Sequence, residues 1–332
     1  MSDSKLKGIY ILEESSLKKI YGSAQRAELE DLLDLSAGCY SSSSIQKNLP
    51  LLNDIDIILS GWGGPRMDRD ILEAAPKLKA IFYGAGSVRG IVTPEFWKAN
   101  IPITSACAMN AIPVAEYTLS QILFCLKLGW QHNQVRGSRT SPPLPVHGAY
   151  RSTIGLISLG TIAKLVRKLL RYHDIEVLVY DPYVDEQTAN EWGVERVTLE
   201  ALFQRSAVVS LHTPDLPETK GMIRREHFEA LPKWASFINT ARSATVCHTE
   251  LCDVLENRPD LWAVLDVTED ASEDEYQRLV NLGNVTITPH IAGSLGPECQ
   301  RMGQLMIDEL RRFLNGDPLE FQITEEQARI MA

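Results

Sequence analysis

Residues 153–181 read TIGLISLGTIAKLVRKLLRYHDIEVLVYD, and this stretch decides the fold class of the chain. The apolar run 153–157 predicts a strand that is buried on both faces. A tight turn, Ser158-Leu159-Gly160, leads into a helical pattern whose apolar residues lie at positions 162, 165, 166, 169 and 170. A second apolar run, 175–180, ends on Asp181. The stretch therefore predicts one β-α-β unit of about 30 residues.

The turn of this unit partly matches the dinucleotide-binding pattern G-x-G-x-x-G. The three positions are Ser158, Gly160 and Ala163, and alanine at the third still permits close packing of helix on strand. Such a degenerate pattern is weak by itself, because small residues often serve packing alone. Asp181 strengthens it: the acid can bind both ribose hydroxyls and would repel a 2′-phosphate, so NAD is favoured over NADP. The expected cofactor contacts here are Ser158, Gly160, Thr161, Ile162 and Asp181.

Composition excludes several classes of partner. The chain has 332 residues, 44% hydrophobic and 23% charged, which is ordinary for a globular protein with two domains. Its net charge of −10 argues against binding nucleic acid or an anionic membrane. No apolar run approaches the roughly 18 residues of a membrane span, and the N-terminus has no signal-peptide core. Six scattered cysteines without a C-x-x-C predict a cytoplasmic protein with no structural metal.

Further strands and helices alternate along the chain, which predicts α/β architecture with parallel sheets. Expected strands lie at 7–12, 55–59, 80–83, 101–104, 207–211, 236–239, 261–267 and 285–288. Expected helices lie at 24–35, 68–75, 113–129 and 296–314, with a short helix from Pro94. The loop 136–150 is expected to lead into the second domain. Ligands bind at the carboxyl ends of strands in such sheets, so the small-residue turns at 60–65 and 84–87 predict a binding wall.

Three residues with suitable chemistry lie at or just after expected strand ends: Arg242, Asp266 and His290. Each of them alone is more often structural, as a surface cation or a hydrogen-bonded residue. Together they would converge on the sheet edge that carries the dinucleotide turn. A nicotinamide site needs a group that orients the carboxamide, a cation for a substrate carboxylate and an acid/base. Asp266, Arg242 and His290 suit these roles in that order.

The sequence resembles the D-isomer-specific 2-hydroxyacid dehydrogenases. The resemblance rests on GLISLGTIAKLV, VLVYDPYV, LHTPDLPETKGMI, FINTARSATV, VLDVTED and NVTITPHIAGS in family order, and on YGAGSVRG and NAIPVAEYTL nearer the N-terminus. It implies a Rossmann-type NAD-binding domain at 116–296, inserted in a flavodoxin-like split substrate domain at 1–115 and 297–332. It also implies a homodimer and interconversion of a small D-2-hydroxy acid with its 2-keto acid.

The resemblance also implies roles for individual residues. Amides near Ala85 and Gly86 would hold a substrate carboxylate with Arg242, and His290 would exchange the proton of the substrate hydroxyl or carbonyl. The cofactor contacts that it adds to those at the turn are Thr213, Pro214, Thr240, Ala241, Asp266, His290 and Gly293.

The chain departs from the family pattern at three positions. The catalytic carboxylate, which orients the histidine and stabilises its imidazolium, is expected 29 residues after Arg242, and position 271 is alanine. Glu269, Asp270 and Glu273 flank this position, and one of them could replace the carboxylate. Ser158 replaces the first glycine of the turn, and Thr161 stands where the family often has arginine beside the pyrophosphate.

These departures keep one alternative open, and a second alternative rests on the β-α-β turn alone. The chain could be a catalytically impaired NAD(H)-binding sensor or corepressor-like protein, motivated by Ala271 and Ser158. A methyltransferase that uses the same β-α-β turn for S-adenosylmethionine is disfavoured, because it would leave Arg242 and His290 without a joint purpose.

Overall fold

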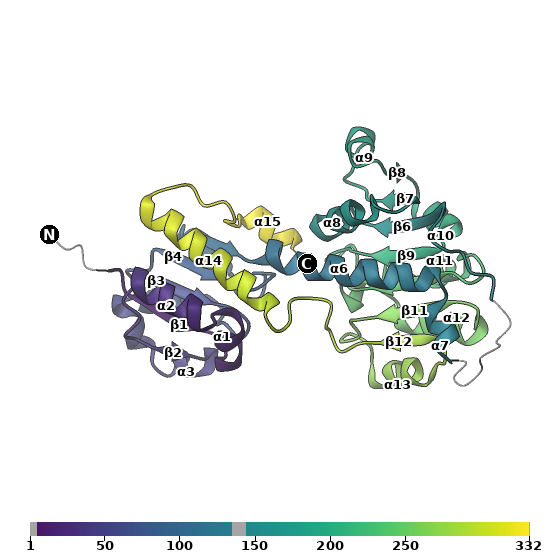
Figure 1. Cartoon of the computed structure of the whole chain (residues 1–332). Coiled ribbons are helices and arrows are strands. Elements are labelled where there is room, and N and C mark those ends of the chain that lie inside the picture. The colour runs from purple at the N-terminus through teal and green to yellow at the C-terminus, as the bar shows by residue number, and fades with distance from the viewer. Residues whose placement is uncertain (1–4, 135–143, 332) are drawn as a thin grey trace. The chain divides into compact units, whose positions relative to one another are not determined.

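The computed structural model describes residues 5–134 and 144–331, which form two compact units (Figure 1). One unit comprises Met1–Asn110 with Ser294–Met331, and the other comprises Ala111–Gly293. Most of the loop expected at 136–150 falls outside the described residues, and positions 144–150 carry no helix or strand. The chain thus leaves the first unit once and returns to it.

The first unit is built on a five-stranded parallel sheet in the order β2-β1-β3-β4-β5. This order is flavodoxin-like, and it confirms the predicted fold class for this part of the chain. Four of the strands coincide with apolar runs, while the two-residue β2 was not predicted. The strands are β1 (Gly8–Ile11), β2 (Cys39–Tyr40), β3 (Ile57–Ser60), β4 (Ala80–Tyr83) and β5 (Ile103–Ser105).

Helices cover this sheet, and the C-terminal segment supplies two of them. They are α1 (Glu14–Ile20), α2 (Ser23–Leu32), α3 (Ser42–Gln46), the 3-10 helix η1 (Leu49–Asp54), α4 (Arg69–Ala74), α5 (Pro94–Lys98), α14 (Glu298–Asn315) and α15 (Glu325–Ile330). In α14, Met302, Met306 and Leu310 recur every four residues and are buried against the core. A Cβ on Gly303 would lie 2.0 Å from the Ile20 carbonyl oxygen, so only glycine allows α14 to pass α1 this closely.

The second unit is built on a seven-stranded parallel sheet in the order β12-β11-β10-β9-β6-β7-β8. The strand order reverses between β6 and β9, as in a Rossmann fold, which places a ligand site beyond their carboxyl ends. The strands are β6 (Ser152–Ile157), β7 (Ile175–Tyr180), β8 (Glu195–Arg196), β9 (Val208–Leu211), β10 (Ser236–Asn239), β11 (Trp262–Leu265) and β12 (Val285–Ile287). The predicted β-α-β unit is confirmed as β6, α8 (Thr161–Leu170) and β7.

Apolar side chains alternate between the two faces of this sheet. On β10, Phe237 packs into a core with α10 to α13, and the next residue, Ile238, packs into a core with α6, α8 and α9. This alternation explains why the strands are apolar throughout. The remaining helices are α6 (Cys107–Leu126), α7 (Gly129–Gln134), α9 (Glu186–Trp192), α10 (Leu199–Arg205), α11 (Arg225–Glu229), the 3-10 helix η2 (Ser243–Thr245), α12 (His248–Asn257) and α13 (Glu273–Asn281).

The expected helix at 113–129 has different bounds in the structure. Helix α6 begins at Cys107 and contains Pro113 in its seventh position, so taking this proline as a helix start was wrong. The Ser105 hydroxyl accepts a hydrogen bond from the Cys107 amide at 3.1 Å and caps the earlier start. Proline costs the helix one backbone hydrogen bond, which burial of the surrounding residues offsets. The helix ends before Leu128, whose φ of +50° breaks it.

Among the described residues, no helix has the length and apolar character required to cross a bilayer.

Candidate active site

The turn between β6 and α8 holds Ser158 in a conformation that favours glycine. The φ of Ser158 is +74°, which explains why glycine is common at this position. Its hydroxyl lies 3.3 Å from Asp181 Oδ2, and the Leu159 amide donates to the same oxygen at 2.8 Å. Asp181 Oδ1 accepts from the Tyr183 amide at 2.9 Å. The acid predicted to bind a ribose is therefore fixed against the turn.

The start of α8 leaves its backbone amides open to an anion. Gly160 is the N-cap residue, and no side chain caps the helix. A Cβ at Gly160 would meet nothing nearer than Ser158 Oγ, at 3.9 Å, so there is room for a ligand beside the backbone. The first-turn amides, at Thr161 and Ile162, carry the positive end of the helix dipole. These features fit a pyrophosphate.

Strand β9, the neighbour of β6 at the switch point, ends in two buried polar side chains. Burial lowers the pKa of His212 to about 4, so its imidazole is neutral at neutral pH. His212 Nε2 lies 3.1 Å from the Ser210 hydroxyl. Within the described residues, His212 Nδ1 and Thr213 Oγ1 are buried without a hydrogen-bond partner. Orphaned polar atoms at this edge fit a ligand that brings its own polar groups.

The segment after β10 is an ordered turn that carries Arg242. The Asn239 side chain accepts from the Ala241 amide at 3.0 Å and donates to the Arg242 carbonyl at 3.2 Å. The buried Thr245 hydroxyl donates to the same carbonyl at 2.7 Å. Arg242 Nη1 donates to the Ala241 carbonyl at 2.7 Å, and the residue is half-buried. The backbone of Arg242 is thus fixed by side chains that lie under the turn.

Asp266, directly after β11, organises the segment that follows β12. Its side chain is 1% exposed and accepts three hydrogen bonds. Asp266 Oδ1 accepts from the Thr288 hydroxyl at 2.6 Å and the Ile291 amide at 2.8 Å, and Oδ2 accepts from the Ala292 amide at 2.8 Å. Three of the roughly four acceptor positions of the carboxylate are therefore used within the protein.

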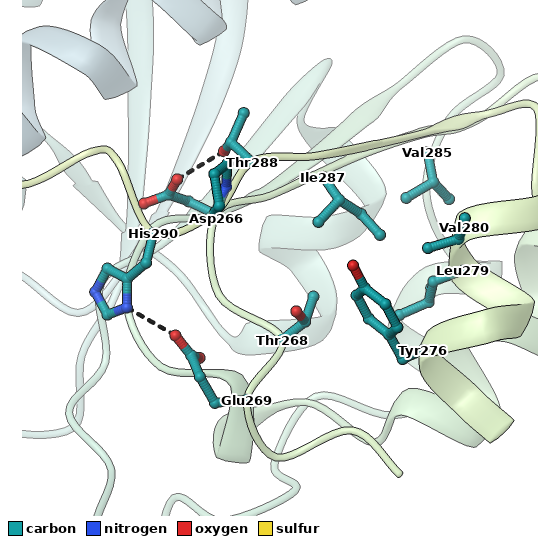
Figure 2. A pocket seen from close by; sticks show the side chains of 11 residues that line it. Asp266, Thr268, Glu269, Tyr276, Leu279, Val280, Val285, Ile287, Thr288 and His290 are labelled. Carbon is teal, nitrogen blue, oxygen red and sulfur yellow. Dashed lines mark hydrogen bonds and ion pairs between the residues drawn. The ribbon is translucent and has the colours of Figure 1, made fainter. Parts of the chain in front are cut away.

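His290 projects from the segment that Asp266 holds. Its φ is +54°, and its amide lies 3.0 Å from the Asp266 carbonyl and 2.9 Å from the Thr288 carbonyl. The ring Nδ1 lies 2.7 Å from Glu269 Oε1, and both side chains are more than half exposed. In Figure 2, Nε2 points away from Glu269 and from the apolar side chains nearby. The pair leaves one ring nitrogen accessible for proton transfer.

The three carboxylates around position 271 have different partners. Glu269 meets His290, Asp270 Oδ2 accepts from the Ser243 hydroxyl at 2.8 Å, and Glu273 Oε1 accepts from Gln277 at 2.9 Å on α13. Ala271 itself closes a turn, with its amide 3.1 Å from the Thr268 carbonyl. The carboxylate beside the histidine therefore comes from two positions earlier than the pattern predicts.

A pocket of about 660 Å³ lies beside this pair, between α13 and the edge strand β12 (Figure 2). Its polar end is formed by Asp266, Glu269 and His290. Its apolar wall includes Val285 and Ile287. Because Nε2 points away from this wall, the pocket lies behind the histidine rather than in front of its accessible nitrogen.

In the first unit, the turn after β4 contains Ala85 and Gly86. The Ser105 hydroxyl lies 3.2 Å from the Ala85 carbonyl oxygen and 2.5 Å from that of Gly86, and the Ala106 amide donates to Ala85 at 3.0 Å. In a trans peptide the carbonyl and the next amide point in opposite directions. The amides of Gly86 and Ser87 therefore point away from β5 and suit an anion.

The structure thus brings Arg242, Asp266 and His290 to the carboxyl ends of β10, β11 and β12, which are neighbours in one sheet. Sequence reasoning left the histidine's partner open among three acids, and it missed Ser243 altogether. In the sequence, only its position shortly after Asp266 indicated Glu269 as a partner of the histidine. Within the described parts of the chain, no group of three or more His, Cys, Asp or Glu residues is placed to hold a metal ion.

Residues 121–292 match the family described as D-isomer specific 2-hydroxyacid dehydrogenase, NAD binding domain. D-3-phosphoglycerate dehydrogenase of Methanocaldococcus jannaschii is 28% identical over 284 residues, which cover 82% of this chain and 52% of that protein. The chain thus spans about half the length of that relative. Glyoxylate reductase of Korarchaeum cryptofilum is 28% identical over 290 residues, which cover 84% of this chain and 86% of the reductase.

A solved structure of D-lactate dehydrogenase from Aquifex aeolicus, complexed with NAD and lactic acid, has a TM-score of 0.72 to this chain. The two are 25% identical, and the match covers 94% of this chain and 96% of the other. The family match spans more than half of the sequence and agrees with the fold and with the resemblance that the motifs predicted. The chain belongs to the D-isomer-specific 2-hydroxyacid dehydrogenases and carries their NAD-binding domain.

Proposed function

We propose that the protein is an active NAD-dependent oxidoreductase that interconverts a small D-2-hydroxy acid and its 2-keto acid. The observation that carries this proposal is the 2.7 Å contact between His290 Nδ1 and Glu269 Oε1. A histidine needs such a partner to keep one tautomer and to stabilise its imidazolium. The contact answers the doubt that Ala271 raises, so it favours an enzyme over an impaired sensor.

In this proposal His290 is the acid/base. With Glu269 on Nδ1, the accessible Nε2 carries the exchangeable proton in the imidazolium and accepts it in the neutral ring. In the direction of reduction, Nε2 gives its proton to the carbonyl oxygen of the 2-keto acid while a hydride adds to the carbonyl carbon. Oxidation reverses both transfers, and Nε2 takes the hydroxyl proton. The bound nicotinamide supplies or accepts the hydride.

Two other groups are assigned to the substrate carboxylate. Arg242 supplies a cation on the segment after β10, the neighbour of the strand that ends at Asp266. The amides of the Ala85–Gly86 turn in the first unit supply hydrogen-bond donors. Holding the substrate carboxylate fixes the reacting carbon of a 2-keto acid, which is how a dehydrogenase orients its substrate.

The cofactor would be held by the switch-point residues. The α8 amides suit the pyrophosphate, and Asp181 suits the adenosine ribose and disfavours a 2′-phosphate. His212 and Thr213 offer buried polar atoms without partners within the described residues. Asp266 is assigned to the nicotinamide end through the segment that it holds, since its own oxygens are largely occupied. The homodimer, the cytoplasmic location and the domain limits near 115 and 296 stay predictions.

The test is NADH oxidation with a panel of 2-keto acids, with NADH affinity measured in parallel. We expect turnover by the wild type and a loss of kcat of about 100-fold or more in His290→Asn, with NADH affinity largely kept. Glu269→Gln keeps an acceptor for Nδ1 but removes the charge, and it should lower kcat less than His290→Asn does. NADH binding without turnover in the wild type, with activity appearing only in Ala271→Glu, would contradict the proposal and identify a switched-off dehydrogenase fold.

A further inference from the structure

The loop that carries Glu269 is tied to the segment that carries Arg242 by one reciprocal contact. The Ser243 hydroxyl donates to Asp270 Oδ2 at 2.8 Å, and the Asp270 amide donates back to the same hydroxyl at 2.7 Å. Ser243 is 1% exposed and directly follows Arg242, while Asp270 directly follows Glu269. The two bonded residues are therefore the immediate neighbours of Arg242 and Glu269, two of the groups assigned to the reaction.

The ends of this loop are anchored independently. At its start, Asp266 is buried beneath the His290 segment. At its end, Ser272 and Glu275 form a capping box on α13, and the Thr249 hydroxyl of α12 donates to Glu275 at 2.5 Å. Between these anchors, the turn closed by Ala271 and Thr268 presents Glu269 to solvent. The Ser243 contact ties the middle of the loop to the segment that follows β10 and carries Arg242.

We infer that Ser243 and Asp270 are a positioning pair. They place Glu269 beside His290 and hold these two residues in a fixed position relative to Arg242. This inference rests on the proposed function. The reason is geometric: Glu269 is more than half exposed, so packing does not fix it, and its backbone must be fixed by its neighbour. The pair touches neither substrate nor cofactor in this account, and it acts through Glu269 and Arg242.

The pair also explains how the chain works with alanine at position 271. A carboxylate two positions earlier in the loop starts from a different backbone site, so the loop must follow a path that brings this earlier residue to the histidine. The reciprocal bonds to Ser243 fix that path at the next residue, since the amide and the carboxylate of Asp270 are both held. Without these bonds the backbone at Glu269 would also have to become ordered, so the contact with His290 would cost more conformational entropy.

The first arm of the experiment measures kcat and KM for Ser243→Ala, Asp270→Ala, Asp270→Asn and the double alanine variant. Ser243→Ala and Asp270→Ala should each lower kcat by about 10- to 100-fold, the range expected for a misplaced group. The double variant should be no worse than either single one, because the two residues act as a unit. Asp270→Asn keeps an acceptor for the Ser243 hydroxyl and should restore most of kcat.

The matched control is Ser272→Ala, which breaks a reciprocal serine contact two residues away in the same loop. It should lower the unfolding temperature about as much as Ser243→Ala does, while kcat changes little. If kcat falls equally in both variants, the effect is general destabilisation and the inference is wrong. The inference also fails if Asp270→Asn is as impaired as Asp270→Ala, because charge rather than geometry then matters.

The second arm does not need turnover, so it separates this inference from the proposed function. Protein with ¹⁵N-labelled histidine reports which ring nitrogen of neutral His290 carries the proton. The wild type should show the Nδ1–H tautomer imposed by Glu269, and Glu269→Ala should lose it. In Ser243→Ala and Asp270→Ala the tautomer population of His290 should shift toward that of Glu269→Ala. In Ser272→Ala it should stay like that of the wild type. Retention of the wild-type tautomer in Ser243→Ala would overturn the inference, whether or not the enzyme turns over.

Discussion

The turn after β6 and the loop after β11 both depart from the family pattern, and the protein accommodates the two departures in different ways. At the turn, Ser158 keeps the position of the glycine and takes its positive φ. In the loop, the carboxylate has moved from position 271 to Glu269, and it meets His290 from there. At the turn after β6 the backbone conformation is kept, and a serine bears the strain of a positive φ. In the loop after β11 the contact between a carboxylate and His290 is kept, but a different residue supplies the carboxylate.

The largest effect is expected at Asp266, whose carboxylate holds the segment that carries His290. Asp266→Ala removes the acceptor for the Thr288 hydroxyl, which keeps its contact with the Tyr117 hydroxyl, and for the amides of Ile291 and Ala292, of which the Ala292 amide is buried. We expect the free energy of unfolding to fall by about 4 kcal/mol and turnover to be lost. Urea unfolding checks this value. Thr288→Val, which removes one of the three donors, is the control and should cost much less; an equal cost would show that the amides do not depend on Asp266.

The next largest effect is a pH dependence of stability that comes from His212, at the end of β9. The pKa of His212 falls from 6.5 to about 4 in the folded protein because the ring is buried. As pH falls below 6.5 the unfolded chain takes up this proton and the folded chain does not, so the free energy of unfolding falls until about pH 4. The total loss is about 3 kcal/mol.

Chemical unfolding at a series of pH values measures that dependence. His212→Asn should flatten the part of the curve between these two pH values. His173→Asn, elsewhere in the same unit, serves as the control and should leave the curve unchanged. A curve for His212→Asn that runs parallel to the wild type would show that this ring is not the group responsible.

A smaller effect is expected at the turn itself. Ser158→Gly relieves the positive φ that Ser158→Ala keeps, and both variants lose the hydroxyl contact with Asp181. The free energy of unfolding should therefore be about 0.5–1 kcal/mol higher for the glycine variant than for the alanine variant, after subtracting glycine's greater flexibility in the unfolded chain. Ser158→Ala keeps the strained φ and loses the contact with Asp181, so it should be less stable than the wild type. Thermal unfolding of the two variants gives the difference. If glycine were no better than alanine, the turn would not be strained.

The smallest effect is expected at the end of the loop after β11. Contacts from the Thr249 hydroxyl and from the Ser272 amide and hydroxyl lower the pKa of Glu275 to about 2. A lowered carboxyl pKa stabilises the fold above the ordinary value of 4.5, and this stability is lost as pH falls toward 2. Glu275→Gln should reduce the acid-induced fall in unfolding temperature. Glu273→Gln, on the same helix turn, should leave it nearly unchanged.

Sequence reasoning predicted the parts of the fold that local patterns determine. The unit β6-α8-β7 and the strand ends before Arg242, Asp266 and His290 followed from apolar runs. It failed at α6, because Pro113 resembles a helix start and the cap at Ser105 lies outside the apolar pattern. It could not choose between Glu269, Asp270 and Glu273, because that choice depends on Ser243, which is distant in sequence.

The left-handed backbone of His290 has a practical consequence for trapping complexes. Because its amide contacts two carbonyls and its φ is +54°, the direction of the side chain is set by the main chain rather than by packing. Asparagine tolerates this backbone better than most residues, whereas alanine does not share that preference. His290→Asn should therefore remove the proposed proton carrier and leave the loop intact. It is the preferred inactive form for crystallising the protein with both cofactor and a keto acid bound.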